Sequence, residues 1–210
     1  MTSRTEKYWL KKFLLYCLIG MNVICLTAEV ALAHSSIQNS EKLEIYDGIG
    51  GNFTLHSSLN HDASLNDYHG KVVVMFFGFT SCPDTCPITL TVLKQVIENF
   101  GKHANQLQTL FITVDPKRDS PEIMKNYLSS FHPSFIGLTG TNQQILSVAE
   151  NYGSAYMKNP SSIDSDSSYL MIHTGNIYLI DQSGQVRAIY PDDTKVKQIV
   201  NDIYGLLLSG

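Results

Sequence analysis

Residues 71–101 have the sequence KVVVMFFGFTSCPDTCPITLTVLKQVIENFG, and this stretch decides the fold. Its first part, 71–79, is a continuous apolar run rich in β-branched and aromatic residues, which is typical of a strand covered on both faces. From Ile88 to Phe100 the apolar residues recur at helical spacing, and Gly101 stands where a left-handed cap would end a helix. We therefore expect a central strand that leads directly into an amphipathic helix.

The same alternation continues after this unit. Residues 107–114 form a second buried apolar run, which predicts a second strand. Residues 120–122 (SPE) then supply an N-cap, a first-turn proline and a first-turn acid for a second helix. Thr141 and Gln144 form a capping box for a third helix, which should end at Tyr152, before a glycine. Strands that alternate with helices indicate a largely parallel sheet.

The C-terminal part of the chain adds an antiparallel hairpin. Residues 176–181 and 185–190 flank a Gln-Ser-Gly turn, in which Gly184 is the permissive residue. A last amphipathic helix begins near Thr194. The sequence thus predicts an α/β protein with a thioredoxin-like fold, in which helices flank a central mixed sheet and a hairpin and a helix close the domain.

Length and composition indicate one globular domain with extensions. The chain has 210 residues, of which 43% are hydrophobic and 16% charged, so it can bury a sizeable core. Its formal net charge is −4, and it has no long basic run. These two features argue against a nucleic acid as the partner.

The first 33 residues indicate export. Four basic side chains lie within residues 1–12, an apolar run follows over 13–28, and residues 31–33 (ALA) offer the small side chains of a cleavage site. An uncleaved N-terminal membrane anchor is the alternative interpretation of 1–33, because about 20 apolar residues span a bilayer. In either case the remainder should lie in an oxidising compartment, at the periplasmic face of the inner membrane or its equivalent.

Two polar segments separate the predicted parts. Residues 34–47 lack sustained periodicity, so we interpret them as a tether and residues 48–210 as the folded domain. If the signal is cleaved, the mature chain begins at His34, and an amino-terminal histidine can chelate Cu(II). Residues 159–168 (NPSSIDSDSS) are too hydrophilic for a core and indicate a loop.

Two of the four cysteines, Cys82 and Cys86, lie outside the N-terminal apolar segment, at the predicted turn from strand to helix. Side chains four residues apart lie on the same side of a helical turn, and a helix N-terminus stabilises thiolates. Such a pair suits disulfide exchange or the binding of a soft metal such as Cu(I). An inert disulfide that braces the turn is the structural alternative.

A histidine is the expected third ligand if the metal is Cu(II), which prefers added nitrogen. His173 ends the apolar stretch 169–172 and lies in the segment that enters the hairpin, which faces the cysteine turn in a thioredoxin-like sheet. Taken alone, a histidine in an apolar segment is more often a hydrogen-bonded structural residue. The remaining histidines of the predicted domain lie in polar or loop contexts and receive no role: His56, His61, His69, His103 and His132.

Three motifs resemble the Sco/SenC family: residues 78–87 (GFTSCPDTCP), 114–121 (VDPKRDSP) and 169–174 (YLMIHT). The resemblance covers the chain from about residue 50 onward, where GGNFTL resembles the opening strand of the family. It implies a membrane-tethered, thioredoxin-like copper protein that helps to assemble the binuclear copper centre of cytochrome c oxidase. The implied copper ligands are Cys82, Cys86 and His173, and the implied partner is the copper-accepting subunit of the oxidase.

One position departs from the family pattern. The family usually has an aspartate directly before this histidine, and the present chain has Ile172. Copper exchange should differ if that acid orients the imidazole or guides docking, because groups around a ligand set its geometry and basicity. Asp115 keeps the Asp-Pro element of the family, and a turn residue after a strand explains it equally well.

Three hypotheses use the same cysteines. The leading one is a copper metallochaperone that holds Cu(I) on Cys82 and Cys86 and adds His173 for Cu(II). The alternative is a thiol-disulfide oxidoreductase in which the two cysteines reduce the cysteines of the target copper site. A peroxidase is the third, and it is weaker because the threonine or serine expected three residues before the nucleophile is replaced by Phe79 or Pro83.

Overall fold

The computed structural model describes residues 43–162 and 169–209. The predicted signal peptide or anchor, most of the predicted tether with His34, and residues 163–168 of the polar loop lie outside the described residues. None of the helices in the described ranges combines the length and the apolar character that a membrane crossing requires.

Seven strands form the main sheet, in the spatial order β2-β1-β5-β4-β3-β8-β9. β3 and β5 run parallel to β4, which lies between them, whereas β8 and β1 are antiparallel to their neighbours β3 and β5. The sheet is therefore mixed, and the predicted α/β class is confirmed. The strands are β1 (Thr54–Ser57), β2 (Asp62–Ser64), β3 (Val72–Gly78), β4 (Leu107–Thr113), β5 (Ile136–Thr139), β8 (Ile177–Ile180) and β9 (Val186–Tyr190).

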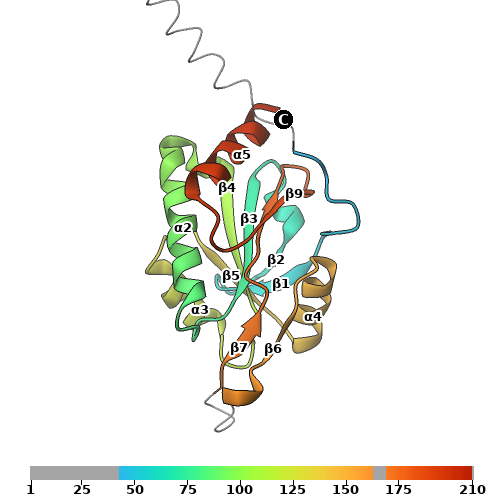
Figure 1. Ribbon diagram of the computed structural model, residues 1–210, viewed down its shortest axis with the longest axis vertical. Helices are drawn as coiled ribbons and strands as arrows, with labels where there is room; N and C mark the ends of the chain where they lie inside the picture. The colour runs from blue at the N-terminus through green and yellow to red at the C-terminus, as the bar shows by residue number, and fades with distance from the viewer. Residues whose placement is uncertain (1–42, 163–168, 210) are drawn as a thin grey trace, which may run out of the picture. The chain divides into compact units, whose positions relative to one another are not determined.

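Four α-helices accompany the sheet in the described part of the chain. Figure 1 shows α2 and α3 on one side of the sheet, α4 on the other, and α5 across its upper end. α2 and α5 also contact each other. The helices are α2 (Thr85–Phe100), α3 (Pro121–Ser129), α4 (Asn142–Asn151) and α5 (Val196–Ser209), and short 3-10 turns are η1 (Leu65–Tyr68), η2 (Gly101–Gln106) and η3 (Pro160–Ser162).

The helix ends follow the local signals in the sequence. Gly101 caps the C-terminus of α2 with a φ of 48°, and the Ser120 side chain accepts a hydrogen bond from Ile123 N at the start of α3. Thr141 and Gln144 form the predicted capping box of α4. Two helix ends differ slightly from the predicted ones. α4 ends at Asn151 instead of Tyr152, and α5 begins at Val196 instead of near Thr194. Differences of this size lie within the usual fraying of helix ends.

Four short strands have no counterpart among the predicted elements. They are β2 and β5 of the main sheet, together with β6 (Tyr156–Lys158) and β7 (Met171–His173), which form a separate two-stranded sheet. Strands of three or four residues are too short to show a period-two pattern, and pairing with distant segments defines them. The separate β6–β7 ribbon is important below, because it carries His173.

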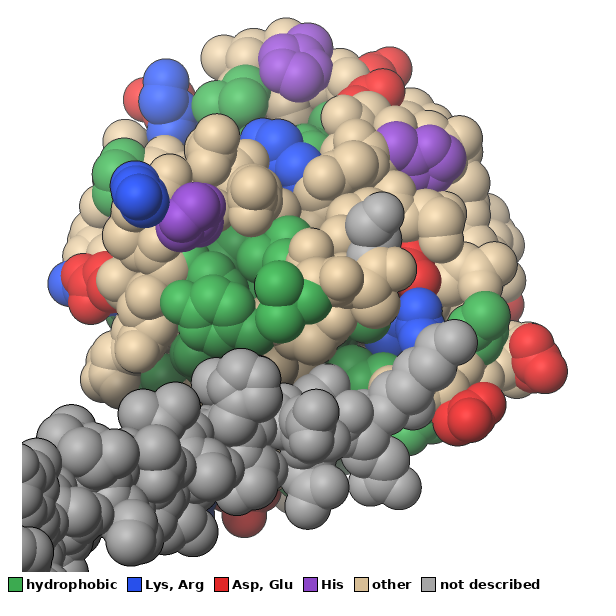
Figure 2. Space-filling view, turned by 90° about the horizontal axis from the view of Figure 1, so that it is seen from above, with side chains coloured by type: hydrophobic (Ala, Val, Ile, Leu, Met, Phe, Trp, Pro, Cys, Tyr) green, Lys and Arg blue, Asp and Glu red, His purple; other side chains and the backbone are tan. Residues whose placement is uncertain are grey.

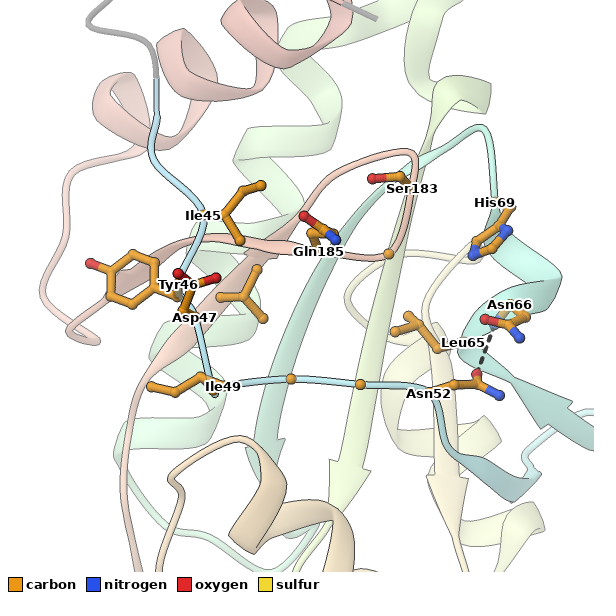
Figure 3. Close-up of a pocket in the computed structure, with 15 residues that line it drawn as sticks. Ile45, Tyr46, Asp47, Ile49, Asn52, Leu65, Asn66, His69, Ser183 and Gln185 are labelled. Carbon is orange, nitrogen blue, oxygen red and sulfur yellow. Dashed lines mark hydrogen bonds between the residues drawn. The ribbon is translucent and has the colours of Figure 1, made fainter.

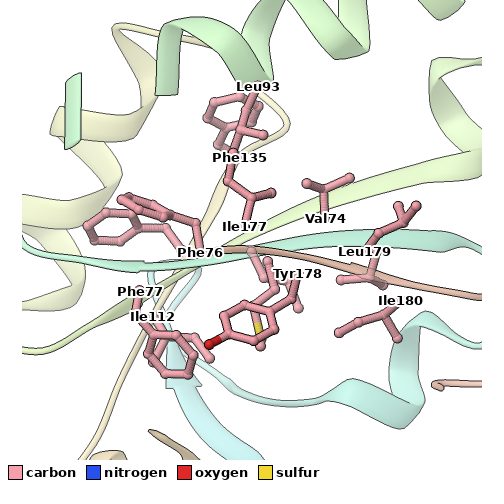
Figure 4. Packing of buried hydrophobic residues seen from close by; sticks show 14 of the residues in the cluster. Val74, Phe76, Phe77, Leu93, Ile112, Phe135, Ile177, Tyr178, Leu179 and Ile180 are labelled. Atoms are coloured by element: carbon pink, nitrogen blue, oxygen red, sulfur yellow. The ribbon is translucent and has the colours of Figure 1, made fainter. Parts of the chain in front are cut away.

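The core is built around β3, whose residues are all buried. Phe76 and Phe77 are consecutive and project from opposite faces of the strand (Figure 4). Phe76 packs against Phe111 of β4, with ring centroids 5.9 Å apart, while Phe77 packs against Tyr178 of β8 at 5.8 Å. The apolar run was predicted to be covered on both faces, and this is confirmed.

The first described residues lie against β9. Tyr46 N donates to Val186 O at 3.0 Å, and the Arg187 guanidinium donates to the carbonyls of Leu43 and Glu44. Contacts of the domain therefore extend into residues 43–47, which the sequence assigns to the tether.

A cavity of about 510 Å³ lies between residues 45–52 and the β8–β9 turn (Figure 3). Figure 2 looks onto the end of the domain that carries α5 in Figure 1, and its basic side chains are scattered among acidic, polar and hydrophobic ones. The described residues on this face form no continuous basic track.

Candidate metal site

The two cysteines lie where β3 passes into α2, as the sequence predicts. Cys82 is half-buried in the turn, and Cys86 is fully buried in the first turn of the helix. The N-cap residue Asp84 makes no side-chain capping bond, and Cys86 N instead donates to Cys82 Sγ at 3.4 Å. The sulfur of Cys82 thus satisfies one of the free N–H groups at the helix N-terminus, where negative charge is stabilised.

Gly78, the last residue of β3, makes room for the second sulfur. A Cβ atom at this position would lie 3.0 Å from Cys86 Sγ and 2.8 Å from ring atoms of Phe76 and Phe111. Contacts this short do not occur without movement of the neighbours. The glycine is therefore required by the close approach of the helix to the strand.

His173 approaches the cysteines from the β6–β7 ribbon. Its Nε2 lies 3.6 Å from Cys86 Sγ, and its Nδ1 lies 3.1 Å from the carbonyl oxygen of Thr174. A carbonyl only accepts, so Nδ1 donates this bond, and Nε2 is the ring nitrogen that faces the sulfur. The rings of Phe76 and Phe79 pack edge-on against the imidazole, with centroids 6.0 and 5.9 Å away.

The three side chains form a group with metal-ligand spacing. One ligand atom from each of Cys82, Cys86 and His173 lies within 4.8 Å of the other two. Because bonds from a metal ion to sulfur or imidazole nitrogen are about 2.0–2.3 Å long, one ion between these atoms could reach all three after a small adjustment. Two sulfurs and one imidazole are soft and borderline donors, which suit copper.

The two thiols differ in their affinity for protons. A hydrogen bond from Cys86 lowers the pKa of Cys82 to about 4, against the opposing effect of burial, and His173 and the backbone N–H groups of Asp84 and Cys86 lower it further. The same hydrogen bond and burial raise the pKa of Cys86. The predicted low-pKa thiolate is confirmed at Cys82. Cys86 holds the remaining proton because a thiolate already lies beside it.

An open cleft of about 290 Å³ gives access to this group. Its wall includes Ile172, whose side chain is 49% exposed. Two carboxylates, Asp84 and Asp192, also line the cleft. A partner or ligand can therefore approach Cys82 and His173 from solvent.

Asp115 is more than a turn residue. Its buried carboxylate accepts hydrogen bonds from the Tyr169 hydroxyl, at 2.7 Å, and from Arg118 Nε. Neither of these hydrogen bonds could be predicted from the sequence, and neither could the burial of the nearby Asp119 carboxylate. All of these residues nevertheless lie in the quoted motifs. The repeated Asp in residues 115–119 (DPKRD) was the available signal, and the sequence alone does not show which acid is buried.

The comparisons with known proteins agree with this geometry. Residues 43–208 match the family model described as SCO1/SenC. The chain belongs to the SCO1/SenC family. It is 34% identical over 191 residues to an "SCO2-like protein" of Rickettsia felis, a similarity that covers 90% of this chain and 92% of the relative.

Two solved structures of the SCO1/SenC family show the same fold. ScoI of Bradyrhizobium japonicum with copper bound is 36% identical, with a TM-score of 0.69, and the match covers 75% of the present chain and 99% of that one. Yeast Sco1 with copper bound is 34% identical, with a TM-score of 0.70 and coverage of 78% and 90%. The predicted membership of this family and the predicted thioredoxin-like fold are confirmed.

Proposed function

We propose that this chain is a copper metallochaperone in which Cys82, Cys86 and His173 hold the copper ion. The observation that carries the proposal is the meeting of these three side chains, from segments 87 residues apart, within 4.8 Å of one another in an open cleft. The copper-bound structures of two SCO1/SenC relatives support copper as the metal.

The two cysteines account for Cu(I), because thiolates are the soft ligands that this ion selects. Cys82 is already a thiolate, while Cys86 loses its proton when the metal binds. His173 adds a nitrogen for Cu(II), with Nε2 free to ligate because Nδ1 donates to Thr174 O. The half-exposed Cys82 leaves one side of the site open for transfer of the ion.

The copper-accepting subunit of cytochrome c oxidase is the proposed recipient, since the SCO1/SenC family is linked to assembly of that enzyme. The proposed place of action is the exported side of the membrane, at the periplasmic face of the inner membrane or its equivalent. The basic and apolar residues 1–33 support this location as a signal or anchor. A tether over 34–47 and a domain over 48–210 complete the proposed organisation, and the last tether residues, 43–47, lie against β9 of the domain.

A thiol-disulfide oxidoreductase is the second candidate, and the unequal thiols of Cys82 and Cys86 favour it. The Cys82 thiolate would attack a target disulfide and form a mixed disulfide, releasing one target thiolate. Cys86 would then lose its proton and attack Cys82 Sγ, which gives the Cys82–Cys86 disulfide and a second target thiol. The proton of Cys86 would pass to solvent, so this route does not depend on His173.

Copper titration tests the leading proposal. The full chain, reduced, anaerobic and in detergent, should take up one Cu(I) per chain in competition with a coloured chelator. Copper uptake far below one per chain would contradict the assignment. In cells that lack their own copy, the His173→Ala variant should fail to restore oxidase assembly at normal copper supply, whereas full restoration would favour the oxidoreductase.

A further inference from the structure

We propose that the loop 113–119 is a clamp that holds the cysteine turn and the histidine ribbon at ligand spacing, with Asp119 and Asp115 as its positioning residues. The inference rests on the proposed copper function and deepens it. It assigns to this loop the task of placing three ligands that come from two separately built segments.

The first arm of the clamp holds the cysteine turn through Asp119. This carboxylate is 1% exposed and lies just before α3. One of its oxygens accepts from Thr80 Oγ at 2.6 Å, and the other accepts from Thr80 N at 3.0 Å and from Thr113 Oγ at 2.6 Å. Thr80 is two residues before Cys82, so these bonds fix the start of the turn that carries the first sulfur.

The second arm holds the histidine segment through Asp115. One oxygen accepts from the Tyr169 hydroxyl at 2.7 Å, and the other pairs with Arg118 Nε. Arg118 Nη1 also donates to Tyr169 O at 2.9 Å, and its guanidinium lies 3.9 Å from the centre of the Tyr169 ring. Tyr169 precedes His173 by four residues, so the arm fixes the chain directly before β7.

The loop between the two arms is itself held in place. Asp119 N donates to Asp115 O at 3.0 Å, Asp115 N donates to Thr113 Oγ at 2.9 Å, and Val114 N donates to Gly78 O at 2.8 Å. The loop is therefore joined to the end of β3 as well as to its own two acids. Movement of one arm is transmitted to the other through a few short bonds.

The fold explains why such a clamp is needed. Among the described strands, β6 and β7 pair only with each other, so no backbone ladder fixes His173 relative to the main sheet. The cysteine turn, by contrast, is continuous with β3 and α2. On its C-terminal side His173 is joined to β8 through residues 174–176, and a side-chain link on the N-terminal side of β7 would limit the remaining movement of the imidazole relative to the sulfurs.

Loss of each arm should affect the binding of the two copper ions differently. This difference distinguishes a positioning role from a general effect on stability. Loosening the Tyr169 arm should lower the affinity for Cu(II), which needs His173, and leave the affinity for Cu(I) almost unchanged. Loosening the Thr80 arm should lower the affinities for both ions, because both use Cys82 and Cys86. A loss of stability alone would not produce this pattern in a chain that remains folded.

Tyr169→Phe tests the histidine arm, with Tyr190→Phe as the matched control. Both tyrosines are 4% exposed, and both donate a hydrogen bond to a carboxylate, Tyr190 to Asp202 at 2.6 Å. In the full chain, Tyr169→Phe should lower Cu(II) affinity about tenfold, as removal of a group that orients a ligand typically does, and lower Cu(I) affinity less than twofold. Tyr190→Phe should change neither affinity more than twofold.

Thr80→Val tests the cysteine arm, with Thr109→Val as its control. The hydroxyl of Thr109 is buried without a hydrogen-bond partner, so its removal deletes no bond. Thr80→Val should lower the affinities for Cu(I) and Cu(II) by similar factors of about three to ten, and Thr109→Val should not. Equal effects of Tyr169→Phe on the two ions, or wild-type affinities in both arm variants, would overturn the clamp.

The metal-free protein gives an independent measurement. Hydrogen–deuterium exchange of residues 169–174 should be faster in Tyr169→Phe than in wild type, while exchange in α2 stays the same. Unchanged exchange in 169–174 would also contradict the clamp. If the wild type itself failed to bind copper, the proposed function would be wrong. If the wild type and every variant bound copper equally well, only the clamp would be wrong.

Discussion

The cysteine turn and the β6–β7 ribbon bring ligands to one place by different means. The turn lies between a fully buried seven-residue strand and a sixteen-residue helix, and Cys86 is completely inaccessible to solvent. The ribbon consists of two three-residue strands outside the main sheet, with Met157 55% and Ile172 49% exposed. Local structure therefore positions the sulfurs, whereas distant contacts position the imidazole.

This difference divides the site into two halves. The cysteine turn, with Cys82 and Cys86, is the rigid half, and the β6–β7 ribbon, with His173, is the adjustable half. In the proposed copper site, the sulfurs of the rigid half would satisfy Cu(I), and Cu(II) would also require the imidazole of the adjustable half. The following predictions alter one half at a time, and they begin with the largest expected effect.

Replacing either sulfur should remove most copper binding. Cys82→Ser and Cys86→Ser each leave one soft ligand, so we expect Cu(I) uptake to fall from one ion per chain to nearly none under chelator competition. Ser81→Ala changes an exposed neighbour in the same turn and should retain full uptake. Unchanged stoichiometry in both cysteine variants would show that the rigid half does not hold the ion.

The reactivity of Cys82 should be nearly independent of pH above its pKa. In the metal-free protein this pKa is about 4, so Cys82 stays a thiolate from pH 8 down to pH 5 and its alkylation rate should stay almost flat. An ordinary thiol, with a pKa of about 8.5, loses roughly tenfold in rate for each pH unit below that value. Mass spectrometry after iodoacetamide treatment measures the rate at each pH. A fall of several hundredfold at Cys82 would contradict the low pKa.

Removing the imidazole should separate the two oxidation states. His173→Ala should lower the affinity for Cu(II) about a hundredfold and the affinity for Cu(I) only a few-fold, because the two sulfurs remain. The sulfur-to-copper charge-transfer bands of Cu(II) should shift or disappear. His61→Ala, an exposed histidine, serves as the control. A wild-type Cu(II) spectrum in His173→Ala would make this residue structural.

Overpacking of the strand next to the sulfur should affect both stability and copper. Gly78→Ala places a methyl group 3.0 Å from Cys86 Sγ and should cost about 1–3 kcal/mol of unfolding free energy. It should also lower Cu(I) affinity about tenfold, because the sulfur must move. Gly137→Ala crowds Met124 and Leu128 instead and should destabilise without weakening copper. Urea unfolding and chelator competition give the two quantities, and equal copper losses in both variants would contradict this explanation.

The smallest effect is expected at Ile172. The Thr174 carbonyl already orients the His173 imidazole, so a carboxylate at position 172 is not needed for that role. We therefore expect Ile172→Asp to change the affinity for either copper ion less than threefold and the stability by no more than about 0.5 kcal/mol. A tenfold gain in Cu(II) affinity would show that a carboxylate here controls the adjustable half.

The sequence was most informative where the physical causes are local. The apolar run of β3, the spacing of α2 and the capping box of α4 are properties of neighbouring residues, so these elements and their ends could be predicted closely. The position of Cys82 and Cys86 at a helix N-terminus followed from these elements. His173 was found from its context and from the resemblance to the Sco/SenC family, since nothing in residues 169–172 indicates its distance from the sulfurs.

What the sequence by itself determined is the strand, the turn and the helix that hold the two sulfurs, because hydrophobic periodicity and capping act over a few residues. Tertiary structure alone decided the β6–β7 ribbon, the unequal pKa values of Cys82 and Cys86, and the buried bonds of Asp115 and Asp119. Each of these depends on groups that are far apart in the chain or on their burial. Only folding brings such groups together and sets how strongly water is excluded around them.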